Sequence, residues 1–308
     1  MDAPLVVWRF TDGKPGHDRQ TAGLLHALAA WRPLAIHTIP VGPLRVSWWG
    51  VLRRRLPALL STLPKPGLLV GAGHGCERTL LAARRACNAP SVYLMKPGLP
   101  LACFDLCLVP RHDDVAAGPA VELTQGVLND LVPGTGPRDG PVPILVGGPS
   151  KHHGWDEAAL LRQIASLVFG SRERHFVISD SRRTPAATSA QLATFAQRGV
   201  SVISHRDVGP DWLRDTLGHA ADAWVTADSV SMLFEALTAG CAVGVLEVPV
   251  LREDRITSIA PLLVRDGVVA SLGQWLAGSR LPRAAQPLAE AARCAAIVDA
   301  RLLRAAAP

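Results

Sequence analysis

Short apolar segments alternate along this chain with longer segments whose apolar residues recur at helical spacing. This alternation predicts βαβ units, because strands buried on both faces of a parallel sheet are apolar throughout. In the first half the expected strands are Leu5–Phe10, Leu68–Gly71, Ser91–Leu94 and Leu106–Val109. In the second half they are Ile144–Val146, His175–Ile178, Val200–Ile203, Ala223–Thr226 and Ala242–Leu246. The predicted fold class is therefore α/β, with parallel sheets covered by helices.

A segment rich in proline and glycine separates these two sets of strands. It runs from Asn129 to Pro143 and is typical of a linker. A chain of 308 residues with 48% hydrophobic content can bury two separate cores. We therefore expect Rossmann-like domains over residues 1–135 and 140–283. Residues 284–308 carry an apolar stripe at helical spacing, which predicts a docked helix, and a return to the first domain is one option.

Composition narrows the partners and the compartment. The net charge of +6 favours anionic partners such as phosphates or an acidic membrane surface. The six cysteines form no Cys-x-x-Cys pair, so reduced thiols are expected. The chain begins without a basic and apolar leader, and no apolar run reaches membrane-spanning length. We expect a cytoplasmic protein that is soluble or peripheral on the inner membrane.

The turn after the first expected strand is the first candidate ligand site. Gly13 and Gly16 let the backbone approach a ligand closely, and the following helix offers free N–H groups to an anion. Ligands of open α/β sheets bind at the carboxyl ends of strands, where this turn lies. Its polar side chains are Asp12, Lys14 and His17. The alternative is a tight connection in which an Asp caps the helix.

A glycine pair opens the second candidate site. Gly147 and Gly148 follow an expected strand and can present backbone amides to a diphosphate, with Ser150 adding a hydroxyl and Lys151 a charge. The alternative is an ordinary loop. The two histidines that follow, His152 and His153, have no evident partner ligand, so we expect surface histidines and no metal site.

Two further segments follow expected strands in the second half. Arginine and hydroxyl side chains at a strand end suit phosphate oxygens, with a solvated turn as the alternative. In the third candidate these are Ser179, Arg182, Arg183 and Thr184. The fourth candidate is a run of capping residues and a helix, in which Asp228, Ser229, Ser231 and Met232 precede Glu235. A buried glutamate needs a partner, such as a protein donor or a ribose diol, and a glutamate exposed at the rim is the alternative.

Several of these motifs occur together in one known family. They are Asp12–His17 with Gln20, Phe104–Asp105 with Pro110–Asp113, Gly147–Pro149, Ser181–Pro185 and Thr226–Ala236. On these residues the chain resembles the Elm-type mitochondrial fission protein family, whose bacterial members are regarded as glycosyltransferases. The resemblance implies a GT-B-like fold, in which two Rossmann-like domains with parallel sheets face a central cleft and bind a nucleotide sugar.

A more remote resemblance implies roles for single residues. The Gly13–His17 loop and the Glu235–Gly240 helix are similar to those of the GT-B enzyme that adds N-acetylglucosamine to lipid-linked peptidoglycan precursors. By that likeness Glu235 holds the donor ribose, while Ser150 and the helix start at Ser229–Ser231 hold the diphosphate. The first loop of that enzyme has more glycine, whereas here Asp12, Lys14 and Pro15 intervene.

Glycosyl transfer needs a base for the acceptor hydroxyl and positive charge for the departing diphosphate. Asp12 and His17 are the candidate bases, and an unperturbed His titrates near pH ~6.5, close to working conditions. The chain contains no Asp-x-Asp metal clamp, so we expect transfer without a metal ion or other cofactor. Helix N-termini with Arg182, Arg183 and Lys151 then stabilise the leaving group.

The acceptor and two rival functions remain open from the sequence. The segment Trp48–Leu56 combines two tryptophans with three arginines, which suits an anionic bilayer surface and favours a lipid-linked or lipopolysaccharide acceptor. The alternative is a helix whose arginines are solvated and whose tryptophans lie in the core. The rivals are a non-catalytic adaptor that binds a protein partner and a nucleotide-sugar epimerase. Nucleic-acid binding is not expected, because the basic residues are scattered.

Overall fold

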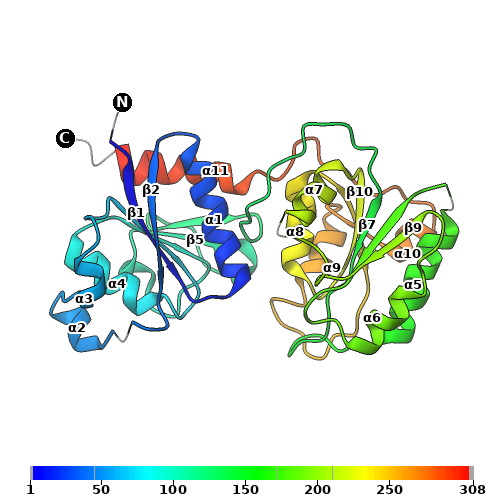
Figure 1. Ribbon diagram of the computed structural model, residues 1–308, viewed down its shortest axis with the longest axis horizontal. Helices are drawn as coiled ribbons and strands as arrows, with labels where there is room; N and C mark the ends of the chain where they lie inside the picture. Colours follow the sequence, from blue (N-terminus) through cyan, green and yellow to red (C-terminus); the bar gives the residue numbers. More distant parts are fainter. Residues whose placement is uncertain (1–2, 45, 172, 210, 305–308) are drawn as a thin grey trace. The chain divides into compact units, whose positions relative to one another are not determined.

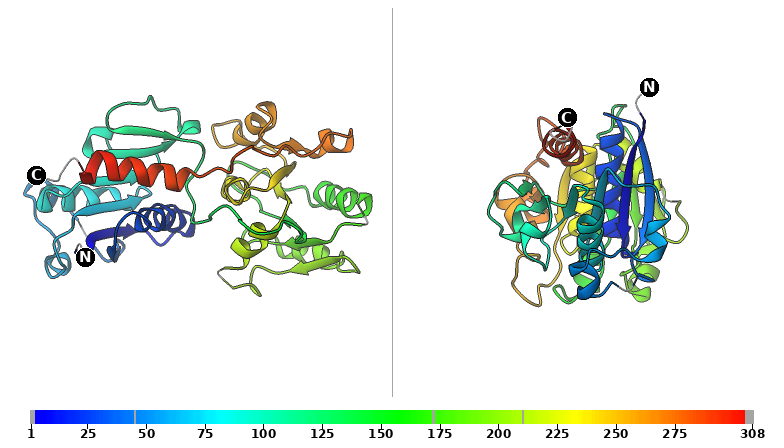
Figure 2. Two further views of the ribbon diagram at one scale, coloured as in Figure 1. Left: turned by 90° about the horizontal axis from the view of Figure 1, so that it is seen from above. Right: turned by 90° about the vertical axis from the view of Figure 1, so that its left-hand side faces the viewer.

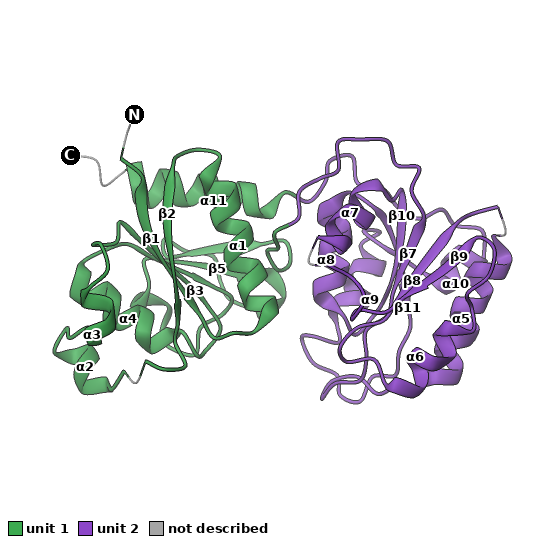
Figure 3. Cartoon of the chain, in the orientation of Figure 1, with its two compact units in different colours: residues 1–130, 289–308 green, residues 131–288 purple. Residues whose placement is uncertain are grey.

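The computed structural model describes residues 3–44, 46–171, 173–209 and 211–304 (Figure 1). The chain divides into two compact units. Unit 1 comprises Met1–Asp130 and Ala289–Pro308, and unit 2 comprises Leu131–Leu288 (Figure 3). Each unit contains a six-stranded sheet whose neighbouring strands are parallel. The predicted class of two Rossmann-like α/β domains is confirmed.

The sheet of unit 1 has the strand order β2-β1-β3-β4-β5-β6. Its strands are β1 (Leu5–Thr11), β2 (Leu34–Pro40), β3 (Leu68–Ala72), β4 (Ser91–Leu94), β5 (Leu106–Pro110) and β6 (Val121–Thr124). Its helical segments are α1 (Pro15–Ala29), α2 (Trp48–Leu52), α3 (Ala58–Ser61), α4 (Glu77–Cys87), η1 (Leu101–Cys103), η2 (Arg111–Asp113), α11 (Glu290–Val298) and the π-helical η3 (Asp299–Arg304).

Both faces of this sheet are apolar, because successive strand residues point to opposite sides. On one face Val7 and Val70 pack in a fully buried cluster with Leu24 of α1. On the other face Trp8 and Leu80 belong to a second cluster, which α4 covers. The burial of both faces explains why the central strands are apolar without polar alternation.

Helix α11 completes unit 1 although it lies at the end of the chain. Cys294, Ala295 and Val298 are fully buried in the same cluster as α1, and α11 contacts α1 directly (Figure 2, red and blue helices). Arg293 of α11 forms an ion pair with Glu122 of β6 at 2.6 Å. The core of unit 1 is therefore built from both ends of the chain.

The sheet of unit 2 has the strand order β12-β11-β10-β7-β8-β9. Its strands are β7 (Val142–Leu145), β8 (Phe176–Ser179), β9 (Val200–Ile203), β10 (Asp222–Thr226), β11 (Ala242–Leu246) and β12 (Ala270–Ser271). Its helices are α5 (Glu157–Gly170), α6 (Ala186–Ala193), α7 (Trp212–His219), α8 (Val230–Ala239), α9 (Ile259–Arg265) and α10 (Leu272–Leu276). Leu160 of α5 and Leu192 of α6 pack in one core cluster with Trp224 of β10.

Each sheet has one point at which the order of its strands reverses. In unit 1 the chain runs outward from β1 to β2 and then continues on the other side of β1 with β3. In unit 2 it runs from β7 through β8 to β9 and then returns to β10 on the other side of β7. The loops after the two central strands of a reversal diverge to opposite faces, and the crevice between them is where open α/β sheets bind ligands.

Candidate functional site

At the reversal in unit 1, the turn from β1 into α1 places Asp12, just after β1, beside His17 in the first turn of α1. Nδ1 of His17 lies 3.0 Å from both carboxylate oxygens of Asp12. The Asp12 side chain is 8% exposed and that of His17 is 17% exposed. Because Nδ1 faces the carboxylate, the other ring nitrogen, Nε2, points away from it. This is the geometry of a histidine that a carboxylate orients.

The pKa of Asp12 bears on which of the two candidate bases, Asp12 or His17, can take a proton. Burial raises this pKa, but hydrogen bonds from His17 and from the Lys14 N–H, together with the charges of these two residues, lower it below its ordinary value. The Lys14 ammonium lies 3.7 Å from Asp12 Oδ2. Asp12 is therefore an ionised carboxylate at neutral pH and is poorly suited to take a proton.

The start of α1 differs from the alternative of a helix capped by an aspartate. Lys14 occupies the N-cap, its side chain caps nothing, and Pro15 is the first helical residue. Gly13 has a positive φ of 77°, and Lys14 and Gly16 are exposed. The turn thus uses Asp12 to hold His17 rather than as the N-cap of the helix.

A glycine-rich loop after β3 covers this pair, and our reading of the sequence missed it. Gly73 has a φ of 81°, and a Cβ there would lie 2.2 Å from His17 Nδ1. A Cβ on Gly75 would lie 3.0 Å from the Cβ of Asp12. Only glycine allows this close approach. The signal was the run of glycines directly after the expected strand Leu68–Gly71.

A buried glutamate at the start of α4 fixes that loop. Glu77 is 5% exposed and accepts hydrogen bonds from the backbone N–H groups of Gly98 (2.8 Å) and Leu99 (3.0 Å). The Tyr93 hydroxyl donates to it at 3.1 Å, and His74 Nδ1 lies 2.7 Å away. Glu77 thus ties together the ends of β3 and β4 at the edge that carries Asp12.

A cavity of about 620 Å³ opens beside Asp12 within unit 1. Its lining includes the apolar side chains of Val41 and Leu44 and the polar side chains of Ser47 and Arg78. An apolar pocket with a few convergent polar groups is the usual form of a small-molecule site. The Asp12–His17 pair therefore stands next to space for a substrate.

In unit 2 the glycine pair after β7 does not present its amides to a ligand, contrary to the expectation. The Gly147 N–H donates to Thr226 Oγ1 at 2.8 Å, and the Gly148 N–H donates to Asp228 Oδ2 at 3.0 Å. A Cβ on Gly147 would lie 2.2 Å from Asp228 Oδ2. The neighbouring strand β10 ends in side chains that occupy these donors, so the glycines position Thr226 and Asp228.

Arg183 and Asp228 form the charged centre of this edge. Arg183 Nη2 lies 2.6 Å from Asp228 Oδ2, and Nη1 donates to the Gly148 carbonyl at 2.5 Å. The Asp228 side chain is fully buried and that of Arg183 is 41% exposed. A buried carboxylate thus holds an arginine whose guanidinium still reaches solvent. Within the described residues Asp228 Oδ1 has no hydrogen-bond partner.

The hydroxyls expected to bind phosphate are mostly used inside the protein. Thr184 Oγ1 donates to the Gly147 carbonyl at 2.5 Å, and Ser179 is 4% exposed with its Oγ 3.3 Å from the Asp180 carbonyl. Ser150 Oγ accepts the N–H groups of His152 and His153, each at 3.1 Å. The Ser179 and Thr184 hydroxyls therefore have a structural role, and the phosphate contact expected of Ser150, whose oxygen accepts only backbone N–H groups, stays a prediction. Arg182 and Lys151 are exposed.

The expectation of two surface histidines is wrong for His153. It is 2% exposed and forms a backbone bridge with Val250, and burial lowers its pKa so that the ring is neutral. His152 is half-buried, with Nδ1 2.5 Å from Asp254 Oδ2. A search of the described residues finds no cluster of three or more His, Cys, Asp or Glu side chains that could hold a metal ion.

Helix α8 begins at the same edge. Ser229 is its N-cap without a side-chain hydrogen bond, Ser231 is exposed, and Met232 is half-buried. The first N–H groups of a helix have no acceptor within it and attract anions. Glu235, one turn further on, is 2% exposed, so the alternative of a glutamate at the rim is wrong.

These two polar clusters, each at the strand reversal of a Rossmann-like sheet, define a protein of the GT-B type. Three solved structures are similar over nearly the whole chain. UDP-GlcNAc 2-epimerase of Methanocaldococcus jannaschii, in complex with UDP-GlcNAc and UDP, has a TM-score of 0.52 at 10% identity and covers 97% of this chain and 100% of its own. The glycotransferase of kitacinnamycin has a TM-score of 0.54 at 13% identity and covers 98% and 100%. MurG of Acinetobacter baumannii has a TM-score of 0.51 at 15% identity and covers 89% and 90%.

The sequence itself identifies the family. The model of the mitochondrial fission ELM1 family matches residues 15–302, and the chain belongs to this family. A search of curated protein sequences gave no significant match. Among the described helices none is long and apolar enough to span a bilayer.

Proposed function

We propose that the protein is a glycosyltransferase that moves a sugar from a nucleotide-sugar donor to an envelope glycan or glycolipid without a metal ion. The observation that carries the proposal is the pair of polar clusters at the two strand reversals. One offers an oriented histidine beside a cavity, and the other offers a fixed arginine beside a helix N-terminus. A proton acceptor and an anion site are the two elements that glycosyl transfer requires.

In this proposal His17 takes the proton from the acceptor hydroxyl through Nε2. Asp12 holds Nδ1 and stabilises the imidazolium that forms, since it stays ionised. The carboxylate is therefore a positioning residue: the histidine takes the proton, and the aspartate orients the histidine ring. The cavity beside Asp12 receives the acceptor.

The donor diphosphate binds at the N-terminus of α8 beside Arg183. The guanidinium is fixed by Asp228 and still partly exposed, so it can stabilise charge on the departing nucleotide without first being ordered. Arg182 and Lys151 add positive charge from exposed positions. Glu235 lies on the same helix and is assigned to the donor ribose. Because Glu235 is buried, the ribose diol would have to approach it from the start of α8. Binding of UDP-GlcNAc by the M. jannaschii relative in fold supports a nucleotide-sugar donor.

The acceptor is assigned to lipid-linked glycans because of the surface next to the cavity. Ser47, which caps α2, lines the cavity, and Trp48 and Trp49 of α2 are 53% and 68% exposed. The alternative of core tryptophans is therefore wrong. Exposed tryptophans followed by arginines suit a peripheral position on an anionic bilayer.

The test measures sugar transfer in two stages. A thermal-shift panel of nucleoside diphosphates and their sugars identifies the donor, since a ligand at about 100 times its Kd stabilises by about 2.7 kcal/mol. The labelled donor is then incubated with a membrane glycolipid fraction and a chelator. We expect labelled lipid, and an Arg183→Gln variant should lose the thermal shift while Arg206→Gln, an exposed arginine elsewhere in unit 2, keeps it.

An epimerase is the second candidate, because a solved UDP-GlcNAc 2-epimerase shares the fold. It would convert the donor alone, and NMR of the donor without acceptor separates the two reactions. Activity that disappears with chelator and returns with magnesium would refute transfer without metal. Partner binding that survives in Glu235→Ala while no nucleotide binds to the wild type would favour the non-catalytic adaptor.

A further inference from the structure

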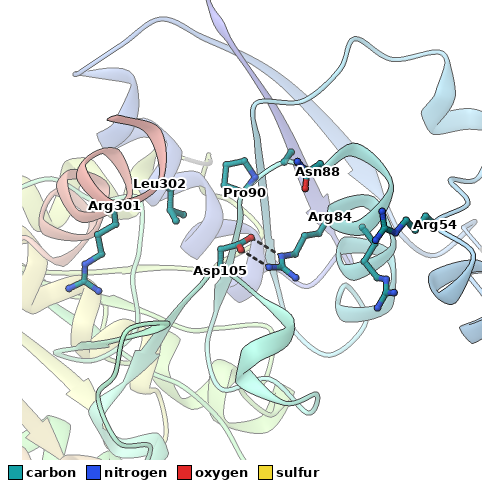
Figure 4. Close-up of a pocket in the computed structure, with 9 residues that line it drawn as sticks. Arg54, Arg84, Asn88, Pro90, Asp105, Arg301 and Leu302 are labelled. Carbon is teal, nitrogen blue, oxygen red and sulfur yellow. Dashed lines mark hydrogen bonds and ion pairs between the residues drawn. The ribbon is translucent and has the colours of Figure 1, made fainter. Parts of the chain in front are cut away.

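A second cavity of about 610 Å³ lies at the opposite edge of the unit 1 sheet. Pro90 directly precedes β4 and Asp105 directly precedes β5, so the cavity is at the amino ends of the strands, away from Asp12. Its charged lining consists of Arg54, Arg84, Arg85, Asp105 and Arg301 (Figure 4). We call this cavity the arginine pocket.

The arginine pocket carries excess positive charge. Arg84 is neutralised by Asp105, to which it donates two hydrogen bonds at 2.8 and 2.6 Å, and Figure 4 shows this pair between Arg54 and Arg301. Arg301 pairs with Glu122 at 2.9 Å. Within the described part of the chain Arg54 and Arg85 have no carboxylate partner, and both are exposed. Two unneutralised guanidinium groups beside a paired one attract an anion, and phosphate oxygens match their planar donors.

Arg54 occupies a backbone position that normally selects glycine. Its φ is +53°, and the N–H groups of Arg54 and Arg55 donate to the carbonyls of Val51 and Gly50. This is the Schellman arrangement that ends a helix, in which the left-handed residue is usually glycine. An arginine here adopts a conformation that its Cβ disfavours. Glycine can therefore replace Arg54 and remove its charge without straining the fold.

Helix α2 presents an apolar surface beside the arginine pocket. Trp48, Trp49 and Leu52 of α2, with Leu59 of α3, are each more than half exposed. The Arg53 guanidinium lies 5.7 Å from the centre of the Trp49 ring. Large apolar side chains next to arginines are the composition of an interfacial membrane surface.

We propose that the arginine pocket binds the phosphate of an anionic lipid headgroup while Trp48 and Trp49 enter the bilayer interface. The positive charge of Arg54 and Arg85 favours an anionic headgroup, and the exposed apolar side chains of α2 and α3 favour a lipid over a soluble phosphate. Ser47, the N-cap of α2, lines the Asp12 cavity, and Arg54, which follows α2, lines the arginine pocket. The binding step itself does not depend on the transfer reaction.

The experiment is vesicle co-sedimentation of the full chain without donor or acceptor. Wild type should bind phosphatidylglycerol vesicles at low salt and bind phosphatidylcholine vesicles weakly. The double variant Arg54→Gly with Arg85→Gln should lose about five-fold affinity per charge, about 25-fold together. The control Arg206→Gln with Arg280→Gln removes the same charge from exposed positions of unit 2 and should bind as wild type.

Two further measurements separate the remaining outcomes. Trp48→Ser with Trp49→Ser should weaken vesicle binding while leaving its salt dependence, and the thermal midpoint of the Arg54→Gly variant should not fall. Unchanged vesicle binding by the arginine variant overturns the proposal, as does a thermal shift with inorganic phosphate that the variant abolishes while vesicle binding persists. Transfer to a soluble acceptor analogue reports on the proposed function separately and should be unaffected by the Arg54→Gly and Arg85→Gln substitutions.

Discussion

In the proposed reaction Asp12 acts through His17, and replacing its carboxylate by an amide tests this at the scale of one residue. In Asp12→Asn the amide NH₂ can donate to Nδ1, which selects the tautomer whose Nε2 carries a proton and cannot accept one. We expect kcat to fall about 100-fold or more, with KM for the donor little changed. Steady-state kinetics of sugar transfer measure both constants.

A matched control lies on the same helix. His26 is exposed in α1, so His26→Gln should keep full turnover, whereas His17→Gln should fall at least as far as Asp12→Asn. Wild-type turnover in both Asp12→Asn and His17→Gln would remove the pair from the reaction.

Gly148 has no room for a side chain, and this gives a second prediction. A Cβ there would lie 2.1 Å from the carbonyl oxygen of Arg183, which is backbone and cannot rotate away. Gly148→Ala should lower the free energy of unfolding by about 2 kcal/mol and displace Arg183, so donor binding should weaken as well. Urea denaturation and the donor thermal shift measure the two effects.

The comparison for this variant is Gly273→Ala in α10 of the same unit. Its Cβ would meet only Ser271 Oγ at 3.8 Å, and alanine in a helix is favoured over glycine by about 0.5–1 kcal/mol. Gly273→Ala should therefore be neutral or stabilising. Equal stability of the two alanine variants would show that the Gly148 loop can shift to accommodate a methyl group without loss of stability.

Local signals allowed part of the site to be predicted from the sequence. Asp12 and His17 lie on one strand-to-helix turn, so their neighbourhood follows from the chain itself. The partners of Gly147 and Gly148 lie on β10, and the bridge that buries His153 comes from Val250. Such contacts depend on which strands become neighbours, and the periodicity of a single segment does not contain that information.

At the scale of elements, α11 is an integral part of unit 1 and its buried face gives a third prediction. Val298 is fully buried against α1, and an aspartate there would place an unpaired charge in the core. Val298→Asp should cost about 3–5 kcal/mol of unfolding free energy. Amide hydrogen exchange should show lost protection in unit 1 and unchanged protection in unit 2.

Ala292 on the same helix provides the control, because it is exposed and lies in the first turn. Ala292→Asp should change stability by less than about 0.5 kcal/mol. Loss of protection across both units in Val298→Asp would mean that the two units do not unfold independently.

The strands that escaped sequence analysis lie at the edges of the sheets. The central strands β1, β3, β4, β5, β10 and β11 were expected within one or two residues of their observed ends. β2 is an edge strand whose residues are mostly exposed or half-buried, and β6 at the other edge has only four residues. β2 and β6 bury less of each face and lack the continuous apolar run that marks a central strand, whereas the edge strand β9 was expected at its observed bounds, Val200–Ile203.

At the scale of the whole molecule, candidate site residues lie at the carboxyl ends of both sheets, and unit 1 carries a second polar cavity at the amino ends of its strands. The carboxyl ends carry Asp12 and His17 in unit 1 and Arg183 and Asp228 in unit 2. The amino ends in unit 1 carry the arginine pocket. Parallel strands make this separation possible, because all their carboxyl ends meet at one edge. If both proposals hold, substitutions at the carboxyl ends should change sugar transfer and substitutions at the arginine pocket should change membrane binding.

The stability of the whole chain against acid gives the last prediction, because two kinds of group contribute in different pH ranges. Burial lowers the pKa of His153 from 6.5, so the unfolded chain binds a proton there before the folded chain does. Stability contributed by the neutral ring is complete above pH 6.5 and is lost as the pH falls through the folded pKa. For Asp105 and Asp180 burial raises the pKa, but hydrogen bonds from Arg84 and Ser91 and from His205 and Ser189 lower it below 3.8.

These two carboxylates therefore stabilise the fold above pH 3.8, and their contribution is lost as the pH falls through their folded values. Urea denaturation from pH 8 to pH 3 should show stability that declines first below about 6.5 and again below about 4. His153→Gln should reduce the first decline and leave the second, and Asp105→Asn should reduce the second and leave the first. Within the described residues, His153 is the one buried histidine whose pKa is lowered. If the decline below pH 6.5 were equally large in His153→Gln, a different group would be responsible for it.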